Sequence, residues 1–173
     1  MRSKKSPFIL LFFIALLAAF FYTALKSPKS QYQVGFLVGQ QLPEFSVKLL
    51  NGKEKLTAET ILADSSEYKL LNFFASWCTT CHIEHPDLLE LSTKQNIKVY
   101  GIVWRDSKNR ALKWLRDHGN PYDVLALDNL GSTKFEFGLI GVPESFLIDA
   151  DNQIIGHFRG PVDLEQIYDI IKY

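Results

Sequence analysis

The longest apolar segment of the chain lies near its beginning. Residues 7–25 (PFILLFFIALLAAFFYTAL) are 19 consecutive positions without a charged side chain. As an α-helix rising about 1.5 Å per residue they would extend ~28 Å, close to the roughly 30 Å hydrocarbon thickness of a bilayer. The pattern therefore predicts a transmembrane anchor at residues 7–25. Residues 26–40 are polar and punctuated by glycine, which favours a linker.

After residue 40 the pattern alternates between short apolar runs and segments with helical spacing. Apolar runs bounded by polar residues predict strands, and Asn51–Gly52 is a strong signal for a two-residue hairpin turn. Alternating β and α units predict an α/β sheet covered by helices, here with an N-terminal β-hairpin extension. The expected strands are 45–50, 69–75, 97–103, 123–128, 145–149 and 154–158, and the expected helices follow Cys81 and cover 108–118, 132–137 and 164–173.

Charge is distributed unevenly, although 19 basic and 19 acidic residues give no formal net charge. Residues 1–29 hold five basic side chains and no acidic one, which leaves 14 basic against 19 acidic residues, a net charge of −5, in the rest. An acidic domain without a basic stripe argues against nucleic acid as a partner. The five basic residues are Arg2, Lys4, Lys5, Lys26 and Lys29.

The basic residues before the apolar run also predict its orientation. By the positive-inside rule, residues 1–6 form a cytoplasmic basic tail, and everything after the anchor at 7–25 is exported. A cleaved signal peptide is the alternative, but it usually has a shorter apolar region and an Ala-x-Ala site, which is absent here. A linker at 26–40 and one folded domain at 41–173 complete the predicted organisation. In either case the domain lies in an oxidising compartment, where paired cysteines are chemically meaningful.

Cys78 and Cys81 are the two cysteines of the chain, and they lie between an apolar strand and a predicted helix. At a helix N-terminus, unpaired backbone N–H groups and the positive end of the dipole favour a thiolate. Cys81, one helical turn later, can attack the mixed disulfide that Cys78 forms with a partner. The spacing therefore predicts a redox-active pair in which Cys78 is the nucleophile and Cys81 resolves.

Three other interpretations fit the same spacing. Residues 78–82 match the CxxCH haem-attachment pattern, but Met1 is the only methionine, so a histidine would have to be the axial ligand. A zinc site would need His82 and His85 beside the cysteines, yet Cys81 and His82 diverge by about 100° around a helix. A static disulfide would gain little entropic stabilisation from so short a loop. We therefore expect no cofactor and no metal.

Two segments together resemble a known family. WCTTC (Trp77–Cys81) follows an apolar strand, and GVPESFLID (Gly141–Asp149) comes about sixty residues later, with HGNPY (His118–Tyr122) between them. From about Gln40 to the C-terminus this arrangement resembles the DsbE/CcmG group of thioredoxin-like cytochrome c biogenesis proteins. The resemblance implies a thioredoxin-like α/β fold, with a central mixed sheet flanked by helices. It also implies a periplasmic domain on a single-pass anchor in the bacterial inner membrane.

The resemblance further implies partners and contact residues. The partners would be protein thiols or disulfides, namely apocytochrome c or other maturation components, and a transmembrane thiol carrier would supply electrons. Pro143 is expected to be a cis-proline that, with Val142, presents backbone to an extended substrate. Trp77 would form an apolar platform beside the cysteines. These three residues are the predicted substrate-binding set.

A departure from ordinary thioredoxins concerns the acid on the strand before the motif. That position aligns with Asn72, which cannot titrate. Glu144 is the expected substitute as proton acceptor for Cys81, and burial would raise the pKa of its carboxyl. Glu84 and His82 are expected to be solvated helix positions.

Three functions remain open on these grounds. The first is a reductant in cytochrome c maturation, and the second is a general anchored thiol reductase for another exported client. The third is a binding module that keeps its disulfide closed. The direction of electron flow depends on reduction potentials relative to the partners, so the reductant assignment rests on the resemblance.

Overall fold

The computed structural model describes residues 7–26, 35–52, 54–94 and 96–171, and in the first of these segments it describes side chains for residues 11–22. The chain divides into two compact units, residues 1–31 and residues 32–173. The predicted basic tail at residues 1–6 and residues 27–34 of the predicted linker lie outside the described residues.

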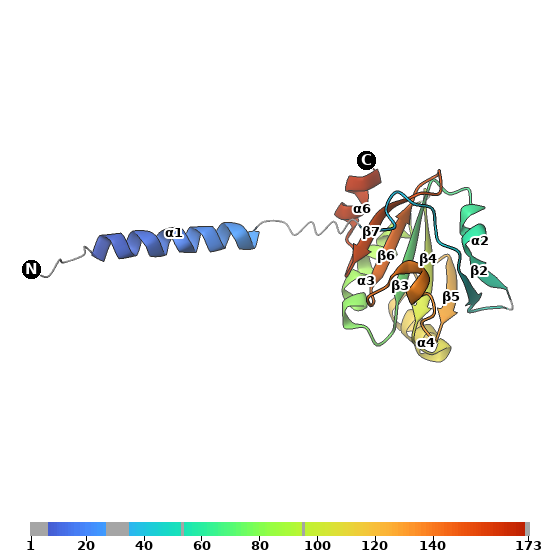
Figure 1. Cartoon of the computed structure of the whole chain (residues 1–173). Helices are drawn as coiled ribbons and strands as arrows, with labels where there is room; N and C mark the ends of the chain where they lie inside the picture. Colours follow the sequence, from blue (N-terminus) through green and yellow to red (C-terminus); the bar gives the residue numbers. More distant parts are fainter. Residues whose placement is uncertain (1–6, 27–34, 53, 95, 172–173) are drawn as a thin grey trace, which may run out of the picture. The chain divides into compact units, whose positions relative to one another are not determined.

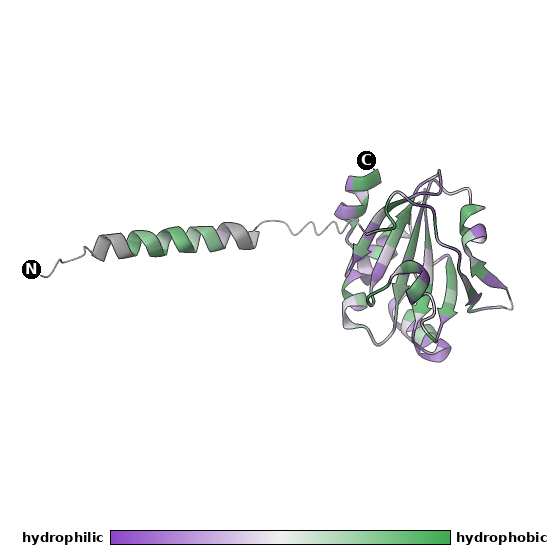
Figure 2. Cartoon of the chain, in the orientation of Figure 1, coloured by the Kyte–Doolittle hydropathy of each residue, from purple (hydrophilic) through white to green (hydrophobic). Residues whose placement is uncertain are grey.

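The first unit contains helix α1 (Pro7–Lys26), which occupies the predicted apolar run. Its large apolar side chains between Leu11 and Tyr22 are 52–65% exposed, and Figure 2 colours this stretch in shades of green. Among the described residues, no helix is long and apolar enough to cross a membrane. The helix is therefore present where it was expected, while the transmembrane span is not confirmed.

The second unit is built on a mixed sheet (Figure 1), whose described strands are arranged in the order β2-β1-β5-β4-β3-β6-β7. β3 pairs in parallel with β4, and β4 with β5, while the other neighbours are antiparallel. The strands are β1 (Ser46–Leu49), β2 (Lys55–Thr57), β3 (Tyr68–Phe74), β4 (Ile97–Trp104), β5 (Val124–Asp128), β6 (Glu144–Ile148) and β7 (Ile154–Arg159).

Helices cover both faces of this sheet. The helices are α2 (Ala58–Leu62), α3 (Thr79–Leu91), α4 (Lys108–His118), α5 (Lys134–Phe137) and α6 (Leu164–Ile171). Side chains of α3, α4 and α6 join one apolar cluster, and those of α2 and α5 join the other. Because side chains alternate along a strand, Leu70 and Phe74 of β3 enter the first cluster and Leu71 and Phe73 the second. The predicted α/β class is confirmed.

Three predictions for the start of the domain need correction. Residues 50–54 separate β1 from β2, so Asn51–Gly52 is not a two-residue turn. β1 also pairs with β5, so β1 and β2 belong to the central sheet and a separate hairpin extension is not confirmed. Residues 35–40, assigned to the linker, pack onto the folded unit: Leu37 is buried, and the Gly39 N–H donates to the Ile154 carbonyl at 2.8 Å.

Candidate functional site

Cys78 lies at the junction between β3 and α3, and it is the N-cap of that helix. Its Sγ accepts a hydrogen bond from the Cys81 N–H at 3.1 Å. A disulfide joins the two cysteines, whose Cα atoms are 5.3 Å apart. The predicted position of the pair at a helix N-terminus is confirmed. This N–H of the first turn, which also donates to the Cys78 carbonyl oxygen at 3.1 Å, therefore points at the sulfur, where it would stabilise negative charge.

The backbone just before Cys78 is held by the turn that follows β4. The Ser76 N–H and hydroxyl both donate to Asp106 Oδ2, at 2.8 and 2.5 Å. The Trp77 indole N–H donates to the Arg105 carbonyl at 3.1 Å, while 53% of the Trp77 surface remains exposed. Burial raises the pKa of the Asp106 carboxyl, but hydrogen bonds from Ser76, Ser107 and Arg110 outweigh it and lower that pKa overall. The Asp106 carboxylate thus holds residues 76–78, which we call the redox loop, in place.

Pro143 lies on the other side of the cysteines. The Val142–Pro143 peptide bond is cis, as predicted. The carbonyl oxygen of Val142 lies 3.5 Å from the Cys78 Sγ, and Val142 is partly exposed. A hollow of about 310 Å³ adjoins this loop and is lined by Thr80, Ile140, Gly141, Val142, Pro143, Glu144, Arg159, Gly160 and Pro161. The structure therefore brings Val142 and Pro143 together with Cys78.

Glu144 is buried as expected, with 1% of its surface exposed, but its partners differ from the prediction. Its Oε1 accepts from His157 Nε2 at 2.7 Å and from Arg159 Nε at 3.1 Å. Its Oε2 accepts from the Ile140 N–H at 3.1 Å. None of the contacts described for this carboxylate reaches Cys81. An ionised carboxylate is costly to bury without a compensating charge, and Arg159, the cross-strand neighbour of Glu144 on β7, provides one.

Glu84 is the acid that sequence reasoning assigned wrongly. Only 1% of its surface is exposed, so it is not a solvated helix position. Its Oε1 accepts from the Asn72 side-chain amide at 2.9 Å, and its Oε2 accepts from the Val162 N–H at 3.0 Å. Burial raises the pKa of this carboxyl to about 7, because neither partner carries a charge. Its position three residues after Cys81 and four before Leu88, both buried, was the available signal.

Asn72 connects Glu84 to a wider buried polar network. The Tyr122 hydroxyl donates to Asn72 Oδ1 at 2.8 Å, and the Asn72 amide also donates to the Ser145 hydroxyl at 2.9 Å. Burial, followed by the charge of Glu84, raises the pKa of Tyr122 well above its ordinary value. Asn72 is thus a neutral strand residue that positions an acid from α3.

His82 is exposed, as expected, and lies against α4. Its ring stacks on Trp114 with centroids 5.0 Å apart, and its Nε2 is 3.2 Å from the Ser76 carbonyl oxygen. The His85 ring also contacts Trp114, and its Nε2 lies 3.2 Å from the Gly119 carbonyl oxygen. Burial lowers the pKa of His85. Within the described ranges, no group of three or more His, Cys, Asp or Glu side chains is arranged to hold a metal ion.

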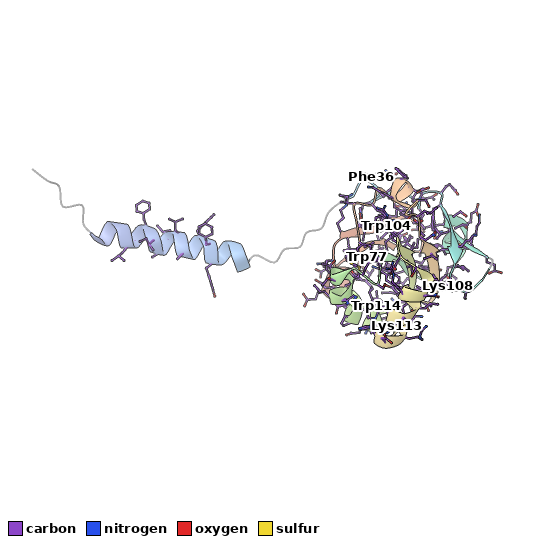
Figure 3. All side chains as sticks on the ribbon, turned by 90° about the horizontal axis from the view of Figure 1, so that it is seen from below. Phe36, Trp77, Trp104, Lys108, Lys113 and Trp114 are labelled. Atoms are coloured by element: carbon purple, nitrogen blue, oxygen red, sulfur yellow. A yellow bond between two sulfur atoms is a disulfide. The ribbon has the colours of Figure 1, made fainter. Side chains whose placement is uncertain are left out.

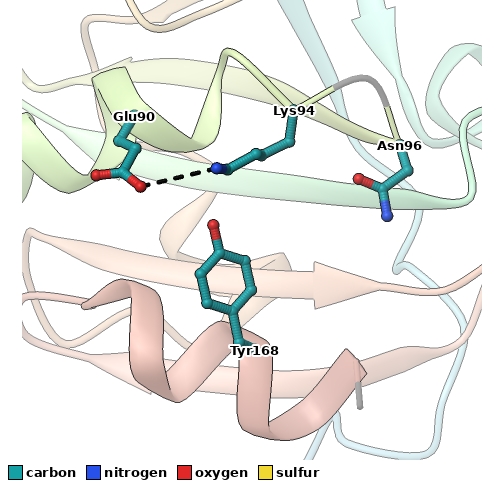
Figure 4. A pocket seen from close by; sticks show the side chains of 4 residues that line it. All are labelled: Glu90, Lys94, Asn96 and Tyr168. Atoms are coloured by element: carbon teal, nitrogen blue, oxygen red, sulfur yellow. Dashed lines mark ion pairs between the residues drawn. The ribbon is translucent and has the colours of Figure 1, made fainter. Parts of the chain in front are cut away.

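A second hollow lies far from the cysteines. It measures about 300 Å³ and is lined by Glu90, Lys94, Asn96 and Tyr168 (Figure 4), with an ion pair of 3.7 Å between Lys94 and Glu90. Glu90 is near the C-terminal end of α3, whereas Cys78 caps its N-terminus. This hollow is therefore not part of the cysteine site.

Comparison with known proteins agrees with this geometry. Residues 37–171 match the redoxin family. A thiol:disulfide interchange protein DsbE of Vibrio cholerae is 39% identical over 93% of this chain and 88% of that protein. The DsbE of Allochromatium vinosum is 33% identical over 94% of this chain and 88% of its own length. The crystal structure of a DsbF homologue from Corynebacterium diphtheriae superimposes with a TM-score of 0.66 at 25% identity, over 84% of this chain and 94% of that chain.

The thioredoxin-like fold and the Cys78–Cys81 disulfide, whose first cysteine caps α3, define a thiol–disulfide oxidoreductase. The chain belongs to the redoxin family and, within it, to the DsbE thiol:disulfide interchange proteins.

Proposed function

We propose that this oxidoreductase is anchored in the bacterial inner membrane by residues 7–25 and acts in the periplasm as a reductant during cytochrome c maturation. The observation that carries the redox chemistry is Cys78 at the N-cap of α3, next to Val142 and cis-Pro143. The uncharged run of 19 residues in the sequence supports the anchor, and the basic residues before it support a periplasmic domain. The client would be apocytochrome c or a maturation component.

In the proposed reaction the reduced protein donates two electrons to a client disulfide. The Cys78 thiolate attacks one client sulfur, a mixed disulfide forms, and the other client sulfur leaves as a thiolate that takes a proton. Cys81, once deprotonated, attacks the Cys78 sulfur and releases the second client thiolate, which is protonated in turn. The products are a client dithiol and the Cys78–Cys81 disulfide seen in the structure. A transmembrane thiol carrier would reduce this disulfide again.

Proton transfer from Cys81 is assigned to Glu84 rather than to Glu144. Glu84 lies one turn after Cys81 on α3, and a carboxyl with a pKa of about 7 can accept or release a proton near neutral pH. Glu144 is already engaged by Arg159 and His157. Its proposed role is to hold the loop before Pro143 through the Ile140 N–H.

Client binding is assigned to the surface around Cys78. An extended client segment would pair with the Val142 carbonyl side of the loop, enter the hollow beside Pro143 and contact the exposed ring of Trp77. This arrangement places a client sulfur next to Cys78, which retains 5% exposure against 1% for Cys81. The more accessible sulfur is therefore the one assigned to attack.

The experiment that tests the client is trapping in cells. A Cys81→Ala variant cannot resolve mixed disulfides, so Cys78 should accumulate covalent adducts that mass spectrometry identifies. We expect apocytochrome c or maturation components, and the Cys78→Ala/Cys81→Ala double variant should trap none. Adducts made only of other exported proteins would favour the general anchored reductase. Failure to recover any adduct would contradict both.

Two further measurements test direction and location. The Cys78–Cys81 reduction potential should lie below that of the client disulfide if the protein is a reductant. A C-terminal alkaline phosphatase fusion should be active, and the full chain should resist alkaline extraction from membranes. An inactive fusion or complete extraction would overturn the anchored periplasmic arrangement.

A further inference from the structure

One segment of the acidic domain is strongly basic. Residues 105–117 carry five basic and two acidic side chains, a net charge of +3. The remainder of residues 30–173 has nine basic and 17 acidic side chains, a net charge of −8. We call the exposed basic side chains of this segment the cationic face; they are Arg105, Lys108, Arg110, Lys113 and Arg116.

The amphipathic pattern of α4 produces this face. The helix buries Ala111, Trp114 and Leu115 and therefore turns its charged positions toward solvent. The side chains of Arg110 and Lys113 are 65% and 71% exposed. Their ion pairs with Asp106 and Asp117 leave the face with its net positive charge. Arg110 pairs with the buried carboxylate of Asp106, whereas both members of the Lys113–Asp117 pair are exposed. Exposed pairs contribute little to stability, so a partner can compete for Lys113.

The cationic face is continuous with the redox site. Ser76, two residues before Cys78, lines a hollow of about 240 Å³ together with Arg110, Lys113, Trp114 and Asp117. The Trp77 indole donates to the Arg105 carbonyl. Figure 3 labels Trp77, Trp114 and Lys113, three of the residues that these contacts involve. A protein whose sulfur reaches Cys78 would therefore have a neighbouring segment within reach of the cationic face.

We propose that the cationic face docks an acidic segment that flanks the reactive cysteines of a client or redox partner. The inference rests on the proposed thiol–disulfide exchange and adds a specificity to it. Charge complementarity supports this choice of occupant, because the rest of the domain surface is net negative and repels acidic chains. The acidic segment is thus steered to the side of the domain where Cys78 lies.

The test uses the reduced full chain in neutral detergent and four probes. Three synthetic peptides share one internal disulfide, flanked by four Glu, four Gln or four Lys residues, and hydroxyethyl disulfide serves as a small uncharged substrate. At about 20 mM salt we expect the Glu peptide to be reduced at least about 10-fold faster than the Lys peptide. At about 0.5 M salt the ratio should approach one, because screening weakens exposed charges.

Charge reversal locates the effect. Lys108→Glu/Lys113→Glu should invert the preference for the Glu peptide, and the Lys108→Gln/Lys113→Gln variant should reduce it. The matched control is Lys48→Glu/Lys55→Glu, which makes the same change in net charge at an exposed cross-strand pair of β1 and β2 and should keep the preference.

Each outcome has one meaning. Equal rates for the three peptides with the wild-type chain would overturn the docking proposal. The same loss of preference in the control pair would do so too, because net charge alone would explain it. Failure to reduce hydroxyethyl disulfide would instead contradict the proposed redox function, which makes the two failures distinguishable.

Discussion

Two buried glutamates lie in the parts of the fold that hold the redox site, and their surroundings are opposite. Glu84 projects from α3, and Glu144 projects from β6 directly after Pro143; each is 1% exposed. Glu84 accepts hydrogen bonds from the Asn72 amide and the Val162 N–H, neither of which is charged. Glu144 accepts from the Arg159 guanidinium and from His157.

The comparison of Glu84 with Glu144 shows that burial alone does not decide the role of an acid. Without a cation, burial raises the pKa of Glu84 to about 7, which suits proton exchange near neutrality. With Arg159 beside it, the Glu144 charge is compensated, and the carboxylate becomes a structural connection between β6, β7 and the Ile140 backbone. The helix side of the site is therefore suited to acid–base work and the sheet side to positioning the Pro143 loop.

The largest effect should follow from removing the compensated acid. Glu144→Ala leaves the Arg159 charge and buried His157 without their acceptor, so we expect the free energy of unfolding to fall by about 3–5 kcal/mol. Urea unfolding followed by circular dichroism measures it. Glu136→Ala on α5 removes an exposed acid and should cost less than about 0.5 kcal/mol. A loss below about 1 kcal/mol for Glu144→Ala would show that the pair is not structural.

Glu84 should instead control the pH dependence of stability. Its pKa is raised from 4.5 to about 7 in the folded state, so the folded protein binds the extra proton between these values. The stabilisation is fully present below pH 4.5 and is lost as pH rises through 7, a total of about 3 kcal/mol.

In the Glu84→Gln variant this contribution to the pH dependence of the free energy of unfolding should disappear. Wild type and variant are compared by urea unfolding at intervals from pH 4.5 to 8. As pH rises, the free energy of unfolding of the wild type should fall relative to that of the variant. Parallel curves would contradict the raised pKa. Glu90→Gln, which changes an exposed acid on α3, is the control and should leave the pH dependence of the free energy of unfolding unchanged.

A smaller effect is expected from Asp106, the carboxylate that clamps the redox loop. Asp106→Asn weakens the hydrogen bonds to Ser76, so we expect a loss of about 1–3 kcal/mol in stability and a change in the rate at which Cys78 reacts with iodoacetamide. Asp128→Asn is the matched control, since Asp128 is equally buried and accepts similar hydrogen bonds from Ser132 and Thr133. If both variants changed the rate of the Cys78 reaction with iodoacetamide equally, the proposed positioning role of Asp106 would be contradicted.

The smallest effect should come from Tyr122, at the edge of the Glu84 network. Tyr122→Phe removes the donor to Asn72 Oδ1 and should reduce stability by about 1 kcal/mol. It should also move the Glu84 transition along the pH axis without abolishing it, because the Asn72–Glu84 hydrogen bond remains. An unchanged unfolding curve and pH profile would show that the hydroxyl is energetically neutral.

Local sequence was sufficient for most elements and for the position of the cysteines. Residues 108–118 form α4 as predicted, because apolar spacing and the glycine after the last turn act within a few residues. Cys78 caps α3 because its apolar strand ends just before it. The cis bond before Pro143 followed from family resemblance rather than from local pattern. The helix α2 was missed and β2 was implied only by the predicted hairpin, because five and three residues carry little periodicity.

What the sequence by itself determined was therefore the order of strands and helices and the helix N-terminus that holds Cys78, since both depend on contacts along the chain. Only the tertiary structure decided the surroundings of the two acids, because the partners of Glu84 come from residues 72 and 162 and the side-chain partners of Glu144 from β7. It also decided that the turn after β4 holds the redox loop, thirty positions away. An electrostatic environment is set by whatever packs around a group, and strand pairing across the sheet brings those residues together.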